Sequence, residues 1–434
     1  MKPLPLTLVF TMACCFAGAA ANVDAPPSSA SRAWDLSDYS GFATGKSYIT
    51  PYPAQTDFTN YPAFSWEKVP RWLAVRSKDA LAPEQVESIA SRYQVVMMEK
   101  ANAQGKASTE EGIRWAAREL KKRNPAIKVF FYWNTVVYYE GYAANAAYQS
   151  DEWSEYTRRA DGTKEYRLIR GKLRTFNHDI PEMQKWWVDT ALGMAADPNI
   201  DGVFLDKVGG GDKSLVDADG NLKAPSNYVN SLIQLSLRMP KGKLLVGNTL
   251  RNERPNGNRE IMRITSGSYF ERWRLPARGT QPRQTEAEAI CVTIQLMREA
   301  LSKGKIIMLQ SGPLADEAVA ADGTASAQFA AGVDFPLAVF LIAAEKYAYF
   351  SYQGSVNALD AQWKWDSSDL ETLNRPLGRP LGDPVKKGYA YTRSFEHVDV
   401  SLNVETKQTH FNWHDAAAKP SVPPKDTRAN KAIQ

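Results

Sequence analysis

Short apolar runs alternate with longer segments that carry one apolar face along most of this chain. A short apolar run that stops at a polar residue is typical of a strand buried on both faces, as in a parallel sheet. Such runs lie at residues 71–76, 94–98, 128–134, 203–205, 243–248, 267–271, 305–310 and 347–352. They predict the eight strands of one parallel sheet.

The segments between these runs predict helices. Their residue ranges are 83–93, 109–123, 181–196, 226–237, 285–302 and 334–346. Strands that alternate with helices, at spacings that allow right-handed crossovers, predict an α/β fold of the (β/α)8 type, a TIM barrel. A Rossmann-like open sheet is the structural alternative. It lacks its usual support, because no G-x-G-x-x-G follows the first predicted strand.

The two ends of the chain have a different composition from the predicted barrel, which covers residues 66–357. Residues 22–65 are rich in Pro, Ser, Ala and Tyr and predict an irregular N-terminal lead-in. Residues 358–413 show partial alternation and predict a small C-terminal antiparallel β domain. Residues 414–434 contain few large apolar side chains, so we expect a disordered tail.

Residues 1–21 have the three parts of a secretory signal peptide. Lys2 supplies a positive charge, residues 4–16 an apolar core, and residues 17–21 a small-residue cleavage region. We therefore expect a secreted or periplasmic protein. The core is too short to span a bilayer, and no later run is longer, so we expect no integral membrane segment after cleavage. Cleavage without lipidation fits best, although lipidation of Cys14 or Cys15 is an open alternative.

The composition of the mature chain limits its chemistry. Removal of the signal leaves Cys291 alone, so no intramolecular disulfide is possible and stability must come from a large core. With 4 histidines and this one cysteine, we expect neither a metal site nor a cofactor. The net charge of +5 has no sustained basic run, which argues against nucleic-acid binding. We expect a monomer.

Polar residues stand where the predicted strands end. A barrel brings the carboxyl ends of all its strands to one rim, which is where catalytic residues lie. The polar residues are Glu99 and Lys100 after the second strand, Asn134 after the third, Asp206 and Lys207 after the fourth, Asn248 after the fifth, Glu271 after the sixth and Gln310 after the seventh. We expect them to form a substrate-binding surface.

Asp206 and Glu271 are the candidate catalytic pair. In a barrel they would lie on strands four and six, close enough to flank one bound group. Two carboxylates are the equipment of most glycoside hydrolases: one attacks the anomeric carbon or activates water, and the other protonates the leaving oxygen. The alternative for Asp206 is to cap the following helix, and for Glu271 to form a surface ion pair with Arg272 or Arg274.

Aromatic residues near these strand ends are candidate sugar-binding platforms. The chain has 12 Trp and 19 Tyr, whose rings can stack on sugars or fill a core. We expect Trp133, Tyr138 and Trp273 to face the substrate. His178 is a candidate donor to the substrate, with capping or packing as its alternative role.

Three stretches resemble putative TIM-barrel glycosyl hydrolases of unassigned substrate. Residues 176–187 end in Trp186-Trp187 and precede 201–208, which carries Asp206, and residues 377–403 resemble the trailing β element of the same group. The similarity covers roughly residues 66–413. It implies a secreted or surface-associated hydrolase of glycans.

The predicted placement of Asp206 and Glu271 also resembles the active-site arrangement of α-galactosidases and dextranases. There the strand-four Asp is the nucleophile and the strand-six carboxylate is the acid/base, and the anomeric configuration is retained. The resemblance thus implies Asp206 as nucleophile and Glu271 as acid/base. Retention requires carboxyl groups about 5–5.5 Å apart, and inversion about 6.5–9.5 Å. The alternatives are a non-catalytic carbohydrate-binding barrel, with the two acids far apart or each paired with a cation, and a structural protein without a ligand.

Overall fold

The structure is a computed structural model. It describes residues 52–208, 226–253, 255–277, 283–312, 332–353 and 370–414. The predicted signal peptide, with Cys14 and Cys15, lies outside these ranges, as do most of the lead-in and all but the first residue of the tail. In the described ranges, no helix has the length and apolar character needed to cross a membrane.

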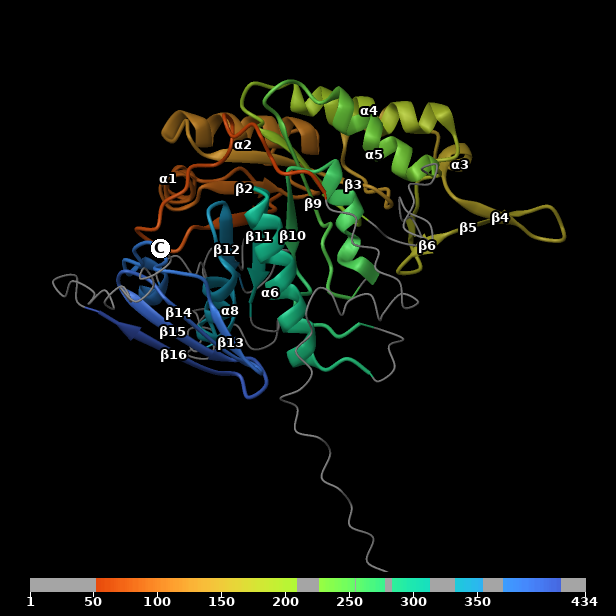
Figure 1. Ribbon diagram of the computed structural model, residues 1–434. Helices are drawn as coiled ribbons and strands as arrows, with labels where there is room; N and C mark the ends of the chain where they lie inside the picture. Colours follow the sequence, from red (N-terminus) through yellow and green to blue (C-terminus); the bar gives the residue numbers. More distant parts are fainter. Residues whose placement is uncertain are drawn as a thin grey trace, which may run out of the picture.

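Eight parallel strands form a barrel in the order β1-β2-β3-β8-β9-β10-β11-β12 (Figure 1). Their bounds are β1 (Trp72–Val75), β2 (Val95–Met98), β3 (Lys128–Asn134), β8 (Gly202–Asp206), β9 (Leu244–Gly247), β10 (Gly267–Phe270), β11 (Ile306–Ser311) and β12 (Ala348–Tyr352). The sheet closes where β1 meets β12, and there Arg71 forms a parallel bridge with Phe350. The side-chain amide of Gln353 also pairs with both backbone groups of Ala74, at 3.3 and 3.2 Å. The predicted TIM barrel is confirmed.

Helices cover the outside of this sheet (Figure 1). The main ones are α1 (Pro83–Arg92), α2 (Thr109–Arg123), α4 (Pro181–Ala195), α5 (Asn227–Arg238), α6 (Glu286–Ser302) and α8 (Asp334–Ala343). Their starts follow from local sequence. Ser108, Ser226 and Thr285 each accept a hydrogen bond from a backbone N–H in the first helical turn. Pro83 and Pro181 occupy the first turn, where a missing N–H costs nothing.

Alternate residues of the strands fill the interior of the barrel. This inner layer consists of Trp72, Ala74, Val95, Met97, Phe130, Tyr132, Phe204, Leu244, Val246, Tyr269, Ile306, Met308 and Tyr349. Side chains alternate along a strand, so the residue two positions further toward the carboxyl end lies on the same face. On every strand that residue is polar, giving a polar ring of Arg76, Glu99, Asn134, Asp206, Asn248, Glu271, Gln310 and Ser351. This polar ring lies at the carboxyl ends of the strands, at the base of the rim.

Residues 52–65 cover the opposite, amino-terminal end of the barrel. Tyr61 is buried and packs edge-to-face on Phe58 and Tyr347. The hydroxyl of Tyr349 donates to the carbonyl oxygen of Pro62 at 3.0 Å. This part of the predicted lead-in is irregular, as expected, but it is packed into the molecule.

A four-stranded antiparallel sheet packs against α8 (Figure 1). Its strands are β13 (Val385–Lys387), β14 (Ala390–Ser394), β15 (Val398–Asn403) and β16 (Gln408–Trp413). Arg393 is buried beneath the sheet, where its guanidinium donates to the carbonyl oxygens of Leu341 and Ala344. It thus satisfies carbonyl groups that the end of α8 leaves unpaired. The predicted C-terminal β domain is confirmed.

A long excursion joins β3 to α4 on the rim side. It contains η3 (Ala143–Ala147), α3 (Ser150–Trp153), the hairpin β4 (Tyr156–Arg158) with β5 (Lys164–Tyr166), and the hairpin β6 (Leu168–Ile169) with β7 (Leu173–Arg174). The β4–β5 hairpin projects from the body of the molecule (Figure 1). Asp161 fixes its turn by accepting hydrogen bonds from the N–H and the hydroxyl of Thr163.

Candidate active site

Asp206 is the last residue of β8, and its carboxylate accepts four hydrogen bonds. Oδ2 accepts from the hydroxyl of Tyr132 at 2.6 Å and from the amide of Asn134 at 3.0 Å. Oδ1 accepts from the backbone N–H of Lys207 at 2.7 Å and from the amide of Asn248 at 3.1 Å. An ionised carboxylate can only accept hydrogen bonds, and these four groups are all donors. The surroundings therefore fit an ionised Asp206.

The backbone of Lys207 supports this arrangement. Its φ of 59° lies in the left-handed region, which a residue with a Cβ atom adopts at an energetic cost. The backbone nitrogen of Lys207 lies 2.7 Å from Oδ1 of Asp206, the residue before it. The hydroxyl of Tyr228 donates to the Lys207 carbonyl oxygen at 3.2 Å and stabilises the turn. The strain is thus located next to the candidate nucleophile.

Glu271 follows β10 directly and is more open to solvent. Its side chain is 39% exposed. Oε1 accepts from the Asn248 amide at 3.1 Å and lies 3.3 Å from the guanidinium of Arg251. Arg251 is shared, because it also pairs with Glu253 at 3.3 Å. Among the described residues, none donates a hydrogen bond to the second oxygen of Glu271.

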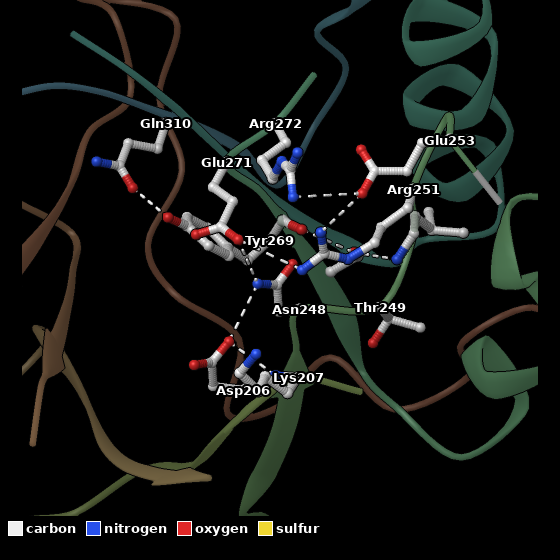
Figure 2. Close-up of polar contacts among 12 residues, drawn as sticks. Asp206, Lys207, Asn248, Thr249, Arg251, Glu253, Tyr269, Glu271, Arg272 and Gln310 are labelled. Carbon is white, nitrogen blue, oxygen red and sulfur yellow. Dashed lines mark hydrogen bonds and ion pairs between the residues drawn. The ribbon is translucent and has the colours of Figure 1, made fainter. Parts of the chain in front are cut away.

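A single amide nitrogen connects the two carboxylates (Figure 2). Nδ2 of Asn248 lies 3.1 Å from Oδ1 of Asp206 and 3.1 Å from Oε1 of Glu271, so these oxygens are at most about 6.2 Å apart, twice that distance. The two N–H bonds of an amide diverge by about 120°, so two linear hydrogen bonds would place the oxygens about 5.4 Å apart. Asn248 is 1% exposed, which fixes the amide between the strand ends.

Lys100 and two tyrosines form the wall beside Asp206. The ammonium nitrogen of Lys100 lies 4.7 Å from the ring centre of Tyr132 and 5.2 Å from that of Tyr139. It also bonds to Glu99 Oε2 at 2.8 Å. Burial raises the pKa of the Glu99 carboxyl, whereas the Lys100 charge opposes this. Glu99 is 6% exposed, so it holds Lys100 in place instead of contacting a substrate as predicted.

Buried tyrosine hydroxyls act as fixed donors in this site. Burial raises the pKa of Tyr132 well above its usual range, and the negative charge of Asp206 adds to this effect. Burial also raises the pKa of Tyr269 well above its usual range, and the negative charge of Glu271 adds to this effect. Both hydroxyls therefore keep their protons. Tyr132 donates to Asp206, and Tyr269 donates to the side-chain oxygen of Gln310.

The sequence model of hypothetical glycosyl hydrolase family 15 (GHL15) matches residues 121–399. This range is well over half of the chain and includes both Asp206 and Glu271. The chain belongs to hypothetical glycosyl hydrolase family 15. The predicted resemblance to putative TIM-barrel glycosyl hydrolases is thereby confirmed, and the protein is a glycosidase.

Several solved glycosidase structures are similar to this one. The glycoside hydrolase domain of PelA from Pseudomonas aeruginosa has 12% identity and a TM-score of 0.40, over 67% of this chain and 96% of that chain. A noncanonic maltogenic alpha-amylase from Thermotoga neapolitana has 9% identity and a TM-score of 0.43, over 77% and 86%. An alpha-galactosidase from Thermus thermophilus has 10% identity and a TM-score of 0.43, over 86% and 71%. No curated protein matches this chain by sequence.

Two of the predicted sugar platforms of the glycosidase are core residues. Trp133 and Trp273 are each 2% exposed. Trp133 lies between Tyr132 and Asn134 on β3 and therefore points away from the barrel interior, where its indole N–H donates to the carbonyl oxygen of Trp187 at 3.2 Å. Trp273 packs on Phe335, with ring centres 6.2 Å apart. The prediction that these two residues face the substrate is wrong.

Tyr138 and His178 are also placed differently from the prediction. Tyr138 stacks on Tyr148, with ring centres 4.6 Å apart, whereas the next residue, Tyr139, faces Tyr132 and Lys100. His178 is 6% exposed, and its ring nitrogens contact the Ser231 hydroxyl at 2.9 Å and the Thr135 carbonyl oxygen at 2.8 Å. Its alternative role in packing is the one observed.

The remaining predicted residues converge on the rim. These are Asp206, Glu271, Lys100, Asn134, Lys207, Asn248 and Gln310. The ion-pair alternative for Glu271 is not observed with the expected partners, because Arg272 lies 3.9 Å from Glu253 and Arg274 lies 2.6 Å from Glu286. Within the described ranges, no three His, Cys, Asp or Glu side chains are grouped so that they could hold a metal ion.

Three residues of the site were missed by the sequence interpretation. Tyr132 stands two positions before Asn134, so the period of two was an available signal that both share one face. Tyr139 and Arg251 lie in irregular segments that follow strands. No periodicity marks such residues, and only the folded chain brings them to Asp206 and Glu271.

Proposed function

We propose that this glycosidase cleaves a poly- or oligosaccharide with retention of the anomeric configuration. Asp206 is the nucleophile and Glu271 is the acid/base. The observation that carries this proposal is the shared Asn248 amide, which limits the two oxygens to about 6.2 Å. That limit suits the spacing of retaining enzymes, about 5–5.5 Å, better than the roughly 6.5–9.5 Å of inverting ones.

In the first step, Asp206 attacks the anomeric carbon while Glu271 donates a proton to the leaving oxygen. The four donors around Asp206 fix its orientation, so little rearrangement is needed for attack. As the ester bond forms, the carboxylate loses its negative charge. The buried hydroxyl of Tyr132 and the amide of Asn134 keep Oδ2 in place throughout.

In the second step, Glu271 removes a proton from water, which attacks the anomeric carbon and releases Asp206. Glu271 must therefore exchange protons with solvent in every cycle, and its exposed side chain allows that exchange. Arg251 divides its charge between Glu253 and Glu271. We propose that Lys100 and Lys207 bind sugar hydroxyls around this pair.

The non-catalytic carbohydrate-binding alternative required two acids that are far apart or separately paired with cations. The common amide donor argues against separation, although Glu271 does contact Arg251. The signal peptide predicted at residues 1–21 supports a secreted or periplasmic location, which we propose for this enzyme.

A panel of soluble polysaccharides and aryl glycosides tests the proposal. Wild type should release reducing ends from at least one member, and Asp206→Asn should not. Proton NMR of the first product should show the anomer of the substrate. Equal activity of the two proteins would remove Asp206 from the chemistry, and an inverted first product would rule out the retaining mechanism.

A further inference from the structure

A groove lies beside α8, and Asp206 is not among its lining residues. Its walls come from the start of α8, from α10 (Glu371–Asn374) and from β16, and its volume is about 430 Å³. Thr409, Phe411 and Trp413 are alternate residues of β16 and all line the groove, so it follows the direction of the strand. We call it the β16 groove. A ligand that lies along these three residues would be extended.

Aromatic and polar side chains are combined in the β16 groove. The rings of Phe411 and Trp413 are nearly parallel, at 24°, with centres 6.2 Å apart. The guanidinium of Arg375 lies 4.7 Å from the centre of the Trp413 ring. The carboxylates of Asp334 and Glu371 stand on the walls. Aromatic faces pack against the C–H faces of sugar rings, and carboxylates accept hydrogen bonds from sugar hydroxyls.

A chain of contacts connects this groove to the candidate active site. Helices of a βα barrel begin at the rim that carries the strand ends, so Asp334, the first residue of α8, is on the rim side. The next residue, Phe335, contacts Trp273, which is two positions after Glu271. The guanidinium of Arg274 lies 5.7 Å from both of these rings. One end of the groove therefore borders the rim.

We propose that the β16 groove is a secondary binding site for the same polysaccharide that the rim cleaves. The nature of the ligand rests on the proposed function, whereas the presence of a site there does not. A chain held in the groove would be kept near Glu271 while its other units enter the rim. Polymers should therefore bind more tightly than short substrates.

Affinity electrophoresis in gels that contain starch, dextran, galactomannan, xylan, polygalacturonate or chitosan tests this proposal. The proteins are Asp206→Asn, which cannot cleave the gel, and the same chain with Phe411→Ala and Glu371→Gln added. We expect at least one polysaccharide to retard the first protein, and the added changes to weaken that binding about tenfold. The control is Asp206→Asn with Phe58→Ala, which alters an exposed aromatic at the opposite end of the barrel.

Activity assays separate this proposal from the proposed function. Phe411→Ala with Glu371→Gln, in the active enzyme, should slow cleavage of the retarding polymer and leave an aryl glycoside unaffected. Equal retardation with and without the groove changes, or no retardation by any gel, overturns the second site even if cleavage persists. If the groove changes abolish retardation but wild type cleaves no substrate, the second site is supported and the catalytic proposal is rejected. A melting temperature equal to that of the parent shows that each variant is folded.

Discussion

The surroundings of Asp206 and of Glu271 differ although both residues occupy the polar ring. Asp206 is anchored by four donors, two from β3, one from the end of β9 and one from the strained turn at Lys207. Glu271 is 39% exposed, and the described residues hold only one of its oxygens. A nucleophile needs a fixed orientation and a negative charge, whereas an acid/base must exchange protons with water. The contrast supports the different roles that we propose for the two carboxylates.

The largest effect should come from Asp206→Asn. The amide cannot form the ester intermediate, so we expect kcat to fall by roughly 10⁴-fold or more. Turnover of the best substrate in the panel measures this. Asp201→Asn is the matched control, because Asp201 lies at the other end of the same strand, paired with Lys121 and Lys128. It should lower stability and leave kcat unchanged; comparable losses in kcat would contradict the special role of Asp206.

Glu271→Gln should have the next largest effect, which should depend on the leaving group. Loss of the proton donor should lower kcat about 10²–10⁴-fold for ordinary glycosides. Dinitrophenyl glycosides need little protonation, so their first step should be nearly unaffected. Burst kinetics on both substrate types measures the difference, with Glu253→Gln as the control that also frees Arg251. A loss that is independent of the leaving group would argue against acid catalysis by Glu271.

Asn248→Ala should disturb both carboxylates together. It removes the amide that each of them accepts from, so we expect a cost of about 1–3 kcal/mol in transition-state stabilisation. The rate should fall for ordinary and for dinitrophenyl glycosides alike, because the same amide holds both carboxylates. A purely structural role would lower the melting temperature and leave kcat in place.

Tyr132→Phe should have a smaller effect, since three donors to Asp206 remain. We expect kcat to fall about three- to tenfold, the value of one hydrogen bond of about 1 kcal/mol. The ring still fills the barrel interior, so the melting temperature should change little. An unaltered kcat would show that this hydroxyl does not contribute to the orientation of Asp206.

Trp133→Phe should have the smallest effect on activity. Trp133 packs between the barrel and α4, so the substitution should lower the free energy of unfolding by about 1–3 kcal/mol and leave KM for glycans unchanged. Chemical denaturation and a KM determination check this pair of outcomes. A large rise in KM would show that Trp133 contacts the glycan after all.

The sequence predicted the strands well because apolar runs that end at polar residues are characteristic of a parallel barrel. It also predicted which strand ends would meet, including Asp206, Asn248 and Glu271. It did not predict which face of each strand points inward. Strands such as β3 are apolar on both faces, so Trp133 and Tyr132 cannot be assigned from hydrophobicity. A shift of one residue moves a side chain from the site to the core.

Contacts made by irregular segments were beyond prediction for a different reason. Arg251 reaches Glu271 from a turn, and Tyr139 reaches Lys100 from the excursion after β3. Residues 52–65 lack periodicity, yet Tyr61 closes the amino-terminal end of the barrel. Such positions depend on tertiary packing, which local patterns do not encode.

The product formed by Asp206→Gly in sodium azide tests the central assignment most directly. Azide should occupy the space of the missing carboxylate and give a glycosyl azide of the opposite anomeric configuration, detected by proton NMR. The matched variant Glu271→Ala should instead give an azide with the configuration of the substrate. The opposite pattern would exchange the roles of the two carboxylates, and failure of azide to rescue Asp206→Gly would contradict a nucleophile at residue 206.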